Sequence, residues 1–168
     1  MLHGAKFSAQ TWEELGTLDK VAEAGFQPWA LDLPGYGESP SCEEQPIRVV
    51  ASFLSSFKQS TILVGPSMGG QLALDIALRA PHLLSGLVLV APVQVKQFAD
   101  QLAKIEVPTL VVWGDQDQVA DPAHAETLKA GMPDARVEII EGGAHPCYLD
   151  DPARWHSLLT GFLTERFG

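Results

Sequence analysis

The sequence predicts an α/β fold in which a mostly parallel sheet is covered by helices on both faces. Short apolar runs typical of buried parallel strands recur along the 168 residues, and stretches with helical periodicity separate them. Regular alternation of this kind favours a parallel sheet. The carboxyl ends of parallel strands meet at one edge, so we expect the functional residues there.

Five apolar runs supply the expected strands. They are residues 27–33, 61–64, 84–91, 109–113 and 137–140. Each run is short and is bounded by turn-forming residues, which favours a strand over a buried helix.

Five helices are expected beside these strands, over residues 9–24, 47–58, 69–80, 123–130 and 152–167. The first carries an apolar stripe at a spacing of three residues (Trp12, Leu15, Leu18 and Val21), and Gly25 is expected to end it. The last is expected to begin after Asp151, because an aspartate can cap a helix and Pro152 suits its first position.

Length and composition limit the possible functions. A chain of 168 residues with 46% hydrophobic residues is expected to form one domain, residues 1–168. The formal net charge of −10 disfavours nucleic acid and anionic membrane surfaces as partners. No apolar run is long enough to span a bilayer. The two cysteines lack C-x-x-C spacing, so we expect neither disulfides nor zinc, and a cytoplasmic location fits best.

Ser67 is the strongest candidate for a catalytic residue. The strand at residues 61–64 leads directly into Gly65-Pro66-Ser67-Met68-Gly69, and a helix follows. This is the strand, sharp turn and helix arrangement of a G-x-S-x-G nucleophile elbow, in which glycines leave room for a strained turn. The alternative is a glycine-rich turn in which Ser67 only caps the helix.

A serine nucleophile needs a base, and the base needs a carboxylate to orient it. Two carboxylates, Asp115 and Asp117, follow the strand at residues 109–113. Asp117 is the favoured one, because it lies farther into the loop, whereas Asp115 sits in the tight turn and suits backbone capping. Asp121 is a more remote alternative. Among five histidines, His145 alone lies between the last strand and the last helix, so it is the expected base.

The remaining histidines are interpreted as structural or surface residues. These are His82, His124 and His156, and also His3, which we expect to hold its loop by a hydrogen bond. In the same loop the backbone N–H of Ala5 is the expected second donor of an oxyanion hole, beside the N–H of Met68. Lys6 is expected to face solvent, where an anionic substrate group could meet it.

With these motifs in order, the chain resembles the α/β-hydrolase superfamily, and within it the α/β hydrolase domain-containing protein 14 family, especially the 14B type. The resemblance spans almost the whole chain. It rests on Leu2-His3-Gly4, on the turn Asp32-Leu33-Pro34-Gly35, on Gly114-Asp115-Gln116-Asp117, and on His145-Pro146-Cys147-Tyr148-Leu149-Asp150. The elbow differs, because both serines that flank the nucleophile in that family are glycines here.

The resemblance implies a small cytosolic or nuclear serine hydrolase that accepts short acyl groups such as acetyl, on esters or on lysine. It also implies coenzyme A as a possible acetyl acceptor, and no metal or prosthetic group. Only about one short helix fits between Pro92 and Pro108, so we expect no cap domain and an open site. An acyltransferase that uses the same residues is the first alternative.

The start of the sequence departs from the resemblance. In the superfamily a central strand leads into the His-Gly loop, between the strand at residues 27–33 and the nucleophile strand. Here the first strands are missing, so unpaired backbone groups are expected on both neighbours. A non-catalytic interaction scaffold or a truncated isoform is therefore a further alternative.

Overall fold

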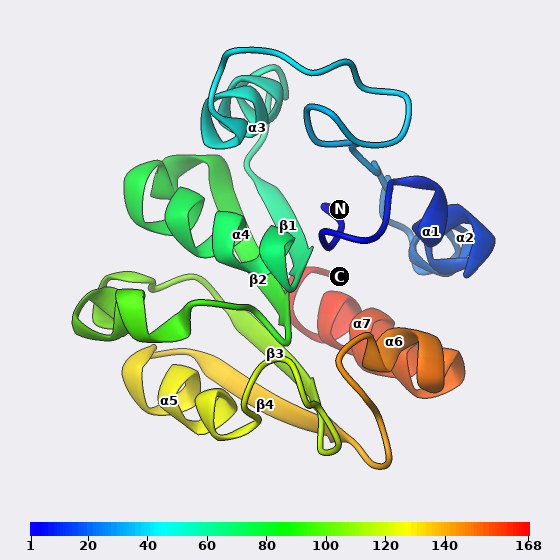
Figure 1. Cartoon of the computed structure of the whole chain (residues 1–168), viewed down its shortest axis with the longest axis vertical. Coiled ribbons are helices and arrows are strands. Elements are labelled where there is room, and N and C mark those ends of the chain that lie inside the picture. The colour runs from blue at the N-terminus through cyan, green and yellow to red at the C-terminus, as the bar shows by residue number, and fades with distance from the viewer.

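The computed structural model describes residues 1–168 and contains a four-stranded parallel sheet. Its strands are β1 (Thr61–Pro66), β2 (Leu84–Val90), β3 (Thr109–Gly114) and β4 (Ala135–Ile140), and they lie side by side in this order (Figure 1). Every neighbouring pair is parallel. Four of the five expected strands and the parallel α/β architecture are thereby confirmed.

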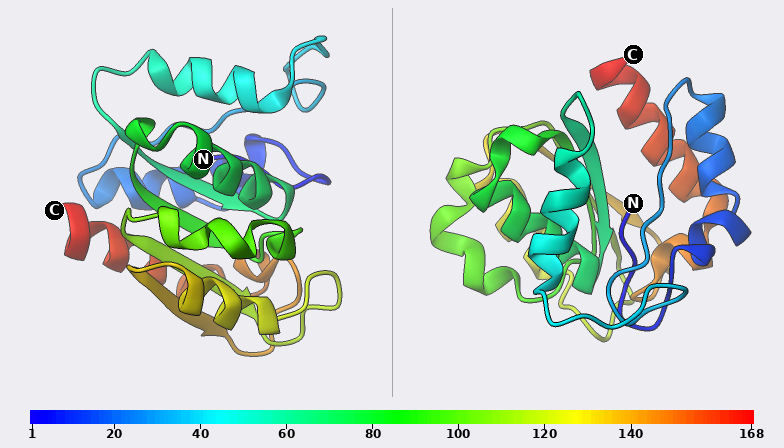
Figure 2. Two further views of the ribbon diagram at one scale, coloured as in Figure 1. Left: turned by 90° about the vertical axis from the view of Figure 1, so that its left-hand side faces the viewer. Right: turned by 90° about the horizontal axis from the view of Figure 1, so that it is seen from above.

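Helices cover both faces of the sheet (Figure 2). One face carries α3 (Pro46–Ser55), α4 (Met68–Arg79), α5 (Ala123–Gly131) and the 3-10 helices η1 (Pro81–Leu83) and η2 (Val95–Lys104). The other carries α1 (Gln10–Glu14), α2 (Thr17–Glu23), α6 (Cys147–Asp150) and α7 (Pro152–Phe167). No helix is both long and apolar enough to cross a bilayer.

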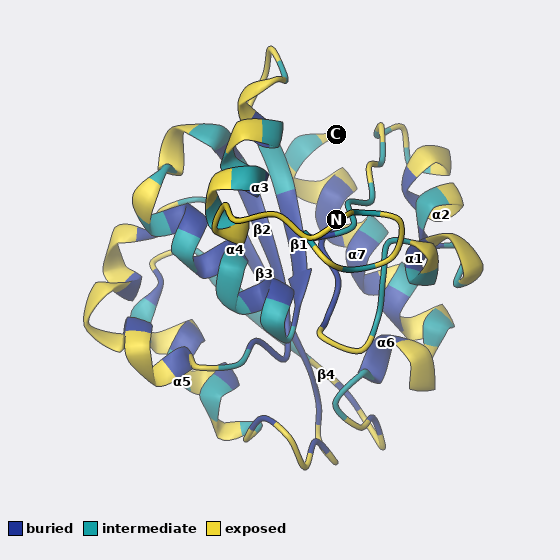
Figure 3. Ribbon diagram, turned by 45° about the horizontal axis from the view of Figure 1, so that its top comes forward, coloured by how far each residue is buried: buried dark blue, intermediate teal, exposed yellow.

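Two hydrophobic cores follow from the alternation of side chains along the strands. In β2, Leu87 and Leu89 point into the core under α4, while Val88 and Val90 point into the core under α7. Because both faces are covered, both sets of residues must be apolar. This explains why the strands read as continuous apolar runs and why β1 to β3 are buried over most of their length (Figure 3).

The expected helix over residues 9–24 is wrong in one respect, because it is two helices. α1 ends at Glu14 and α2 begins at Thr17, and between them Gly16 adopts a left-handed conformation with φ of 74°. Glycine adopts this conformation without steric cost, so the chain can change direction there. The apolar stripe itself is confirmed, since Trp12 and Val21 are both buried.

The expected strand at residues 27–33 is also wrong. This segment is extended but lies in no strand, because only Met1 to His3 run beside it. Leu31 N donates to Met1 O at 3.0 Å, and on the other side Leu2 N donates to Val64 O of β1 at 2.8 Å. Residues 1–3 therefore bridge the two segments with too few bonds to form a regular ladder.

An apolar cavity of about 510 Å³ is lined by Met1, by Trp29 and by Ile62 of β1. Residues of α3 and α7 also line it, including Leu54 and Leu163. Desolvation in this setting lowers the pKa of the Met1 amine to about 5. The expectation that both neighbouring segments have unpaired backbone groups is wrong for Val64 O, Leu31 N and Leu33 N, because residues 1–3 supply their partners.

Candidate active site

Ser67 lies at a strained turn between β1 and α4. Its backbone has φ of 50° and ψ of −114°, a conformation that residues other than glycine rarely adopt. Tight packing explains the flanking glycines: a Cβ atom at Gly65 would lie 2.4 Å from Gly69 O, and one at Gly69 would lie 2.7 Å from His3 O. In this chain, a larger residue at either position would require the neighbouring backbone to shift.

The backbone of the elbow is held by its neighbours. Ser67 N donates to Val90 O at 2.8 Å, and Ser67 O accepts from Val93 N at 3.3 Å in the loop after β2. The Ser67 hydroxyl makes no capping bond to α4, so the alternative of a capping serine is wrong. The hydroxyl is free to interact elsewhere.

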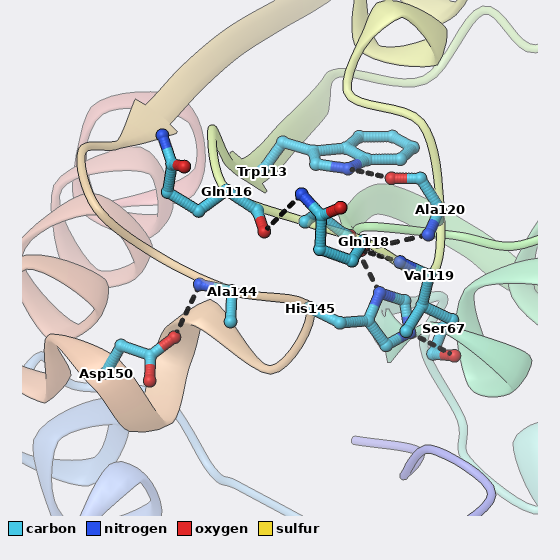
Figure 4. Close-up of polar contacts among 10 residues, drawn as sticks. Ser67, Trp113, Gln116, Gln118, Val119, Ala120, Ala144, His145 and Asp150 are labelled. Carbon is cyan, nitrogen blue, oxygen red and sulfur yellow. Dashed lines mark hydrogen bonds and ion pairs between the residues drawn. The ribbon is translucent and has the colours of Figure 1, made fainter.

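His145 links Ser67 to Asp117. Its Nε2 lies 2.8 Å from Ser67 Oγ, and its Nδ1 lies 2.7 Å from Asp117 Oδ2. Figure 4 shows the imidazole pointing toward Ser67 from the loop that follows β4. The structure thus brings together three residues that are separated by up to 78 positions in the chain.

The hydrogen bonds assign the protons. Asp117 is 5% exposed, and its Oδ1 accepts from Val119 N at 2.7 Å and from Ala120 N at 2.9 Å. An ionised carboxylate only accepts, so Nδ1 of His145 must carry the proton toward Asp117. Nε2 is then an acceptor and faces the hydroxyl of Ser67. This is the arrangement that a general base for a serine nucleophile requires.

The two other aspartates act on the backbone. Asp115 Oδ1 accepts from Gly142 N at 2.7 Å, so it braces the loop that carries His145. Asp121 Oδ1 accepts from Ala123 N at 2.9 Å at the start of α5. Neither carboxylate bonds to His145, which agrees with the interpretation of Asp115 as a capping residue.

None of the other histidines is hydrogen-bonded to Ser67. His3 is buried; its Nε2 accepts from Leu33 N at 3.0 Å and its Nδ1 donates to Gly4 O at 2.9 Å, so it holds its loop as expected. His156 pairs with Thr17 at 3.0 Å, and desolvation, followed by the charge of Lys20, lowers its pKa. His82 is exposed, and the ring of His124 faces Trp113.

The expected oxyanion donors lie beside the elbow. Met68 is the first residue of α4, where backbone N–H groups lack helical acceptors. On the other side, a Cβ atom at Gly4 would be 3.6 Å from Ser67 Cβ, which brings the loop of Ala5 next to the nucleophile. Ala5 and Lys6 are both exposed.

The two thiols should differ sharply in reactivity. Burial, followed by the charges of Asp117 and Asp150, raises the pKa of Cys147 to about 12, whereas Cys42 is exposed. At pH 8 we expect a disulfide reagent to titrate one thiol in the native protein and both in denaturant. Cys42→Ser should abolish the native reaction, and fast native labelling of Cys147 would contradict the packing described.

No group of three or more histidine, cysteine, aspartate or glutamate side chains is placed to hold a metal ion.

Two models of known families match the chain. The model of the alpha/beta hydrolase family matches residues 1–105, and a second model described as alpha/beta hydrolase fold matches residues 93–152. The chain is an α/β-hydrolase. The likeness extends to solved structures, including a CIB-like hydrolase from Thermoplasma acidophilum with a TM-score of 0.93 and 27% identity over 98% of this chain and 84% of that one.

Within this family the hydrolase is similar to ABHD14 proteins over nearly its whole length. A rat (Rattus norvegicus) ABHD14B protein, whose name describes it as a candidate protein-lysine deacylase, is 40% identical over 98% of this chain and 82% of its own. The ABHD14A protein of Danio rerio is 36% identical over 98% of this chain and 63% of its own. These matches confirm the resemblance to the ABHD14 family.

Several hydrogen bonds that hold the site residues of this α/β-hydrolase in place were not predicted from the sequence. The N–H groups of Val119 and Ala120 fix the Asp117 carboxylate, and Asp150 Oδ2 accepts from Ala144 N at 2.7 Å. The first pair follows from aspartate in a turn, a recognisable signal. The bond from Asp150 has no such signal, because it depends on how α6 folds back.

Proposed function

We propose that the protein is a serine hydrolase that cleaves short-chain acyl esters or amides through an acyl-enzyme on Ser67. The observation that carries this proposal is the continuous hydrogen-bond chain from Asp117 through His145 to Ser67 Oγ, with both links between 2.7 and 2.8 Å. A nucleophile, a base and an orienting carboxylate in contact are the requirements for acyl transfer.

In the first half of the reaction, Ser67 Oγ attacks the acyl carbonyl carbon while its proton passes to His145 Nε2. The carbonyl oxygen becomes an oxyanion, and the N–H groups of Met68 and Ala5 are the proposed donors to it. Asp117 stabilises the imidazolium that forms. The tetrahedral intermediate then expels the alcohol or amine, which takes the proton from His145 Nε2, and the acyl group remains on Ser67.

In the second half, water attacks the ester carbon of the acyl-enzyme. His145 Nε2 takes a proton from this water, and the bond between the acyl carbon and Ser67 Oγ breaks. Oγ recovers its proton from the imidazolium, which restores the hydrogen-bond chain. The net reaction adds one water across the acyl bond and needs no other reactant.

The surroundings of Ser67 support small acyl groups. Only η2 lies between β2 and β3, so no cap domain covers the elbow, and Ser67 lines neither the cavity of about 510 Å³ nor one of about 370 Å³ beside Met68. Long acyl chains need an enclosed apolar channel, whereas an acetyl group does not. Acylated lysine is the proposed natural class of substrate, by similarity to the rat relative, whose name mentions lysine deacylation.

A series of p-nitrophenyl esters tests this substrate class. We expect kcat/KM to be highest for the acetate and to fall through butyrate to octanoate, with an acetyl group trapped on the Ser67 peptide after rapid acid quenching. A preference for octanoate would contradict the assignment to short acyl groups. Turnover without an acetyl group on Ser67 would contradict the proposed acyl-enzyme mechanism.

Transfer to a thiol is a second candidate, because an uncovered acyl-enzyme is accessible to a nucleophile larger than water. The sulfur of coenzyme A would attack the acyl carbon, its proton would pass to His145 Nε2, and Ser67 Oγ would leave. Product analysis with and without coenzyme A separates the two reactions. Acetyl-coenzyme A as the main product would favour transfer, and free acetate in both cases would favour hydrolysis.

A further inference from the structure

The loop that carries His145 has little regular structure of its own. Residues 141–146 belong to no helix or strand, and Gly142 has φ of 73°. Pro146 has no N–H to donate. The imidazole must nevertheless stay within hydrogen-bond distance of both Asp117 and Ser67. Groups outside the loop therefore have to fix its backbone.

The turn after β3 fixes the first part of this loop. Asp115 Oδ1 accepts from Gly142 N at 2.7 Å, and Gln116 N donates to Gly143 O at 2.9 Å. The two segments pack closely, since a Cβ atom at Gly114 would be 2.1 Å from Gly143 O. The hydrogen bonds from this turn end at Gly143, two residues before His145, although the packing extends to Ala144, whose O would lie 2.5 Å from the same Cβ atom.

Asp150 supplies the next contact, and it does so from the opposite side. Its Oδ2 accepts from Ala144 N at 2.7 Å (Figure 4), so the bond closes a loop in which His145 lies. Ala144 directly precedes His145, and its amide therefore sets the direction in which the His145 backbone starts. A hydrogen bond with an ionised acceptor is stronger than a neutral one.

The short helix that carries Asp150 is packed into the core. Asp150 is the last residue of α6, whose Cys147 and Tyr148 are buried. The ring of Tyr148 lies 5.0 Å from that of Trp12 and 6.2 Å from that of Trp155. The short helix is thereby anchored in the core beneath α7, and the carboxylate of Asp150 transmits this fixed position to Ala144.

We propose that Asp150 is a positioning residue. Through the backbone N–H of Ala144, it keeps the imidazole of His145 within hydrogen-bond distance of Ser67 and Asp117. This inference rests on the proposed function. The side chain of Asp150 bonds to Ala144 N and makes no hydrogen bond to Ser67, to Asp117 or to the imidazole of His145. Its effect is on the rate of the chemical step, because a misplacement of about 1 Å can cost roughly a hundredfold in rate.

Three variants test the proposal in the full chain: Asp150→Ala, Asp150→Asn and the control Asp151→Ala. Asp151 is the matched control because its Oδ1 also accepts a backbone N–H, from Arg154 at 2.9 Å, but this bond caps α7 and does not reach the His145 loop. Asparagine at position 150 keeps the shape and one acceptor oxygen.

For p-nitrophenyl acetate we expect Asp150→Ala to lower kcat roughly ten- to a hundredfold with KM nearly unchanged. Asp150→Asn should recover most of this loss, and Asp151→Ala should lower the midpoint of thermal unfolding while kcat stays within about twofold. A kcat of Asp150→Ala equal to that of Asp151→Ala would overturn the proposal. Failure of Asp150→Asn to restore kcat would do the same.

Amide hydrogen exchange separates this proposal from the proposed function. Exchange of the Ala144 amide should be faster in Asp150→Ala than in the wild type, whether or not the protein is an esterase. Unchanged exchange at Ala144 would overturn the positioning role alone. Wild-type turnover that is insensitive to Ser67→Ala would instead overturn the proposed function.

Discussion

His145→Ala is expected to lower kcat for p-nitrophenyl acetate by about a millionfold, the loss typical when the base of a serine nucleophile is removed. No other histidine lies within hydrogen-bond distance of Ser67, since His3 and His156 bond to Leu33 and Thr17. Without the base, the hydroxyl of Ser67 keeps its proton and is a weak nucleophile. Steady-state kinetics of the variant and the wild type under the same conditions is the measurement.

The matched control is His82→Ala. His82 lies exposed in η1, beyond the end of α4 that is opposite the elbow, and its removal should leave kcat within about twofold, as is usual for surface substitutions. Both variants should unfold cooperatively near the wild-type temperature. A folded His145→Ala protein that keeps a tenth or more of the wild-type kcat would show that another group is the base.

Asp117→Asn is expected to lower kcat by about four orders of magnitude, for a reason specific to this loop. Oδ1 of Asp117 accepts from the N–H groups of Val119 and Ala120. In the variant, the carbonyl oxygen of the asparagine would accept these two hydrogen bonds, because its NH₂ group cannot. Its NH₂ group would then face His145 Nδ1 as a donor. The imidazole would have to accept there and carry its proton on Nε2, where it could not take the proton of Ser67.

Asp121→Asn provides the control for Asp117→Asn, because Asp121 is exposed and caps only the start of α5. We expect Asp121→Asn to keep kcat within about twofold. Because the argument concerns a tautomer, the proton on the His145 ring can also be located by NMR: on Nδ1 in the wild type and on Nε2 in Asp117→Asn. An unchanged tautomer together with an unchanged kcat would exclude Asp117 as the orienting carboxylate.

The parallel sheet and most helices could be predicted from the sequence because local patterns determine them. Strands buried on both faces are apolar throughout, as residues 87–90 are, and Asp151 with Pro152 marks the start of α7. The break at Gly16 was missed, because a glycine inside an amphipathic stripe is compatible with a continuous helix. The segment 27–33 has the composition of a strand, but strand formation depends on a neighbouring ladder, which no local pattern reveals.

Sequence order also indicated the residues that meet at the site. Ser67, Asp117 and His145 each follow a different strand, and parallel strands bring these positions to one edge. The choice of Asp117 over Asp115 depended on loop length alone, and the structure places Asp115 on Gly142 N instead. The contact from Asp150 to Ala144 could not be predicted, because it requires the path of α6 in three dimensions.

Labelling with a fluorophosphonate probe tests the central claim, that Ser67 is an activated nucleophile, most directly. The wild-type chain should be labelled stoichiometrically, with the adduct on the peptide that contains Ser67, and Ser67→Ala should not be labelled although it remains folded. A folded wild-type protein that resists labelling, or a Ser67→Ala protein that is labelled as fast as the wild type, would contradict the account. The first result would favour a non-catalytic scaffold.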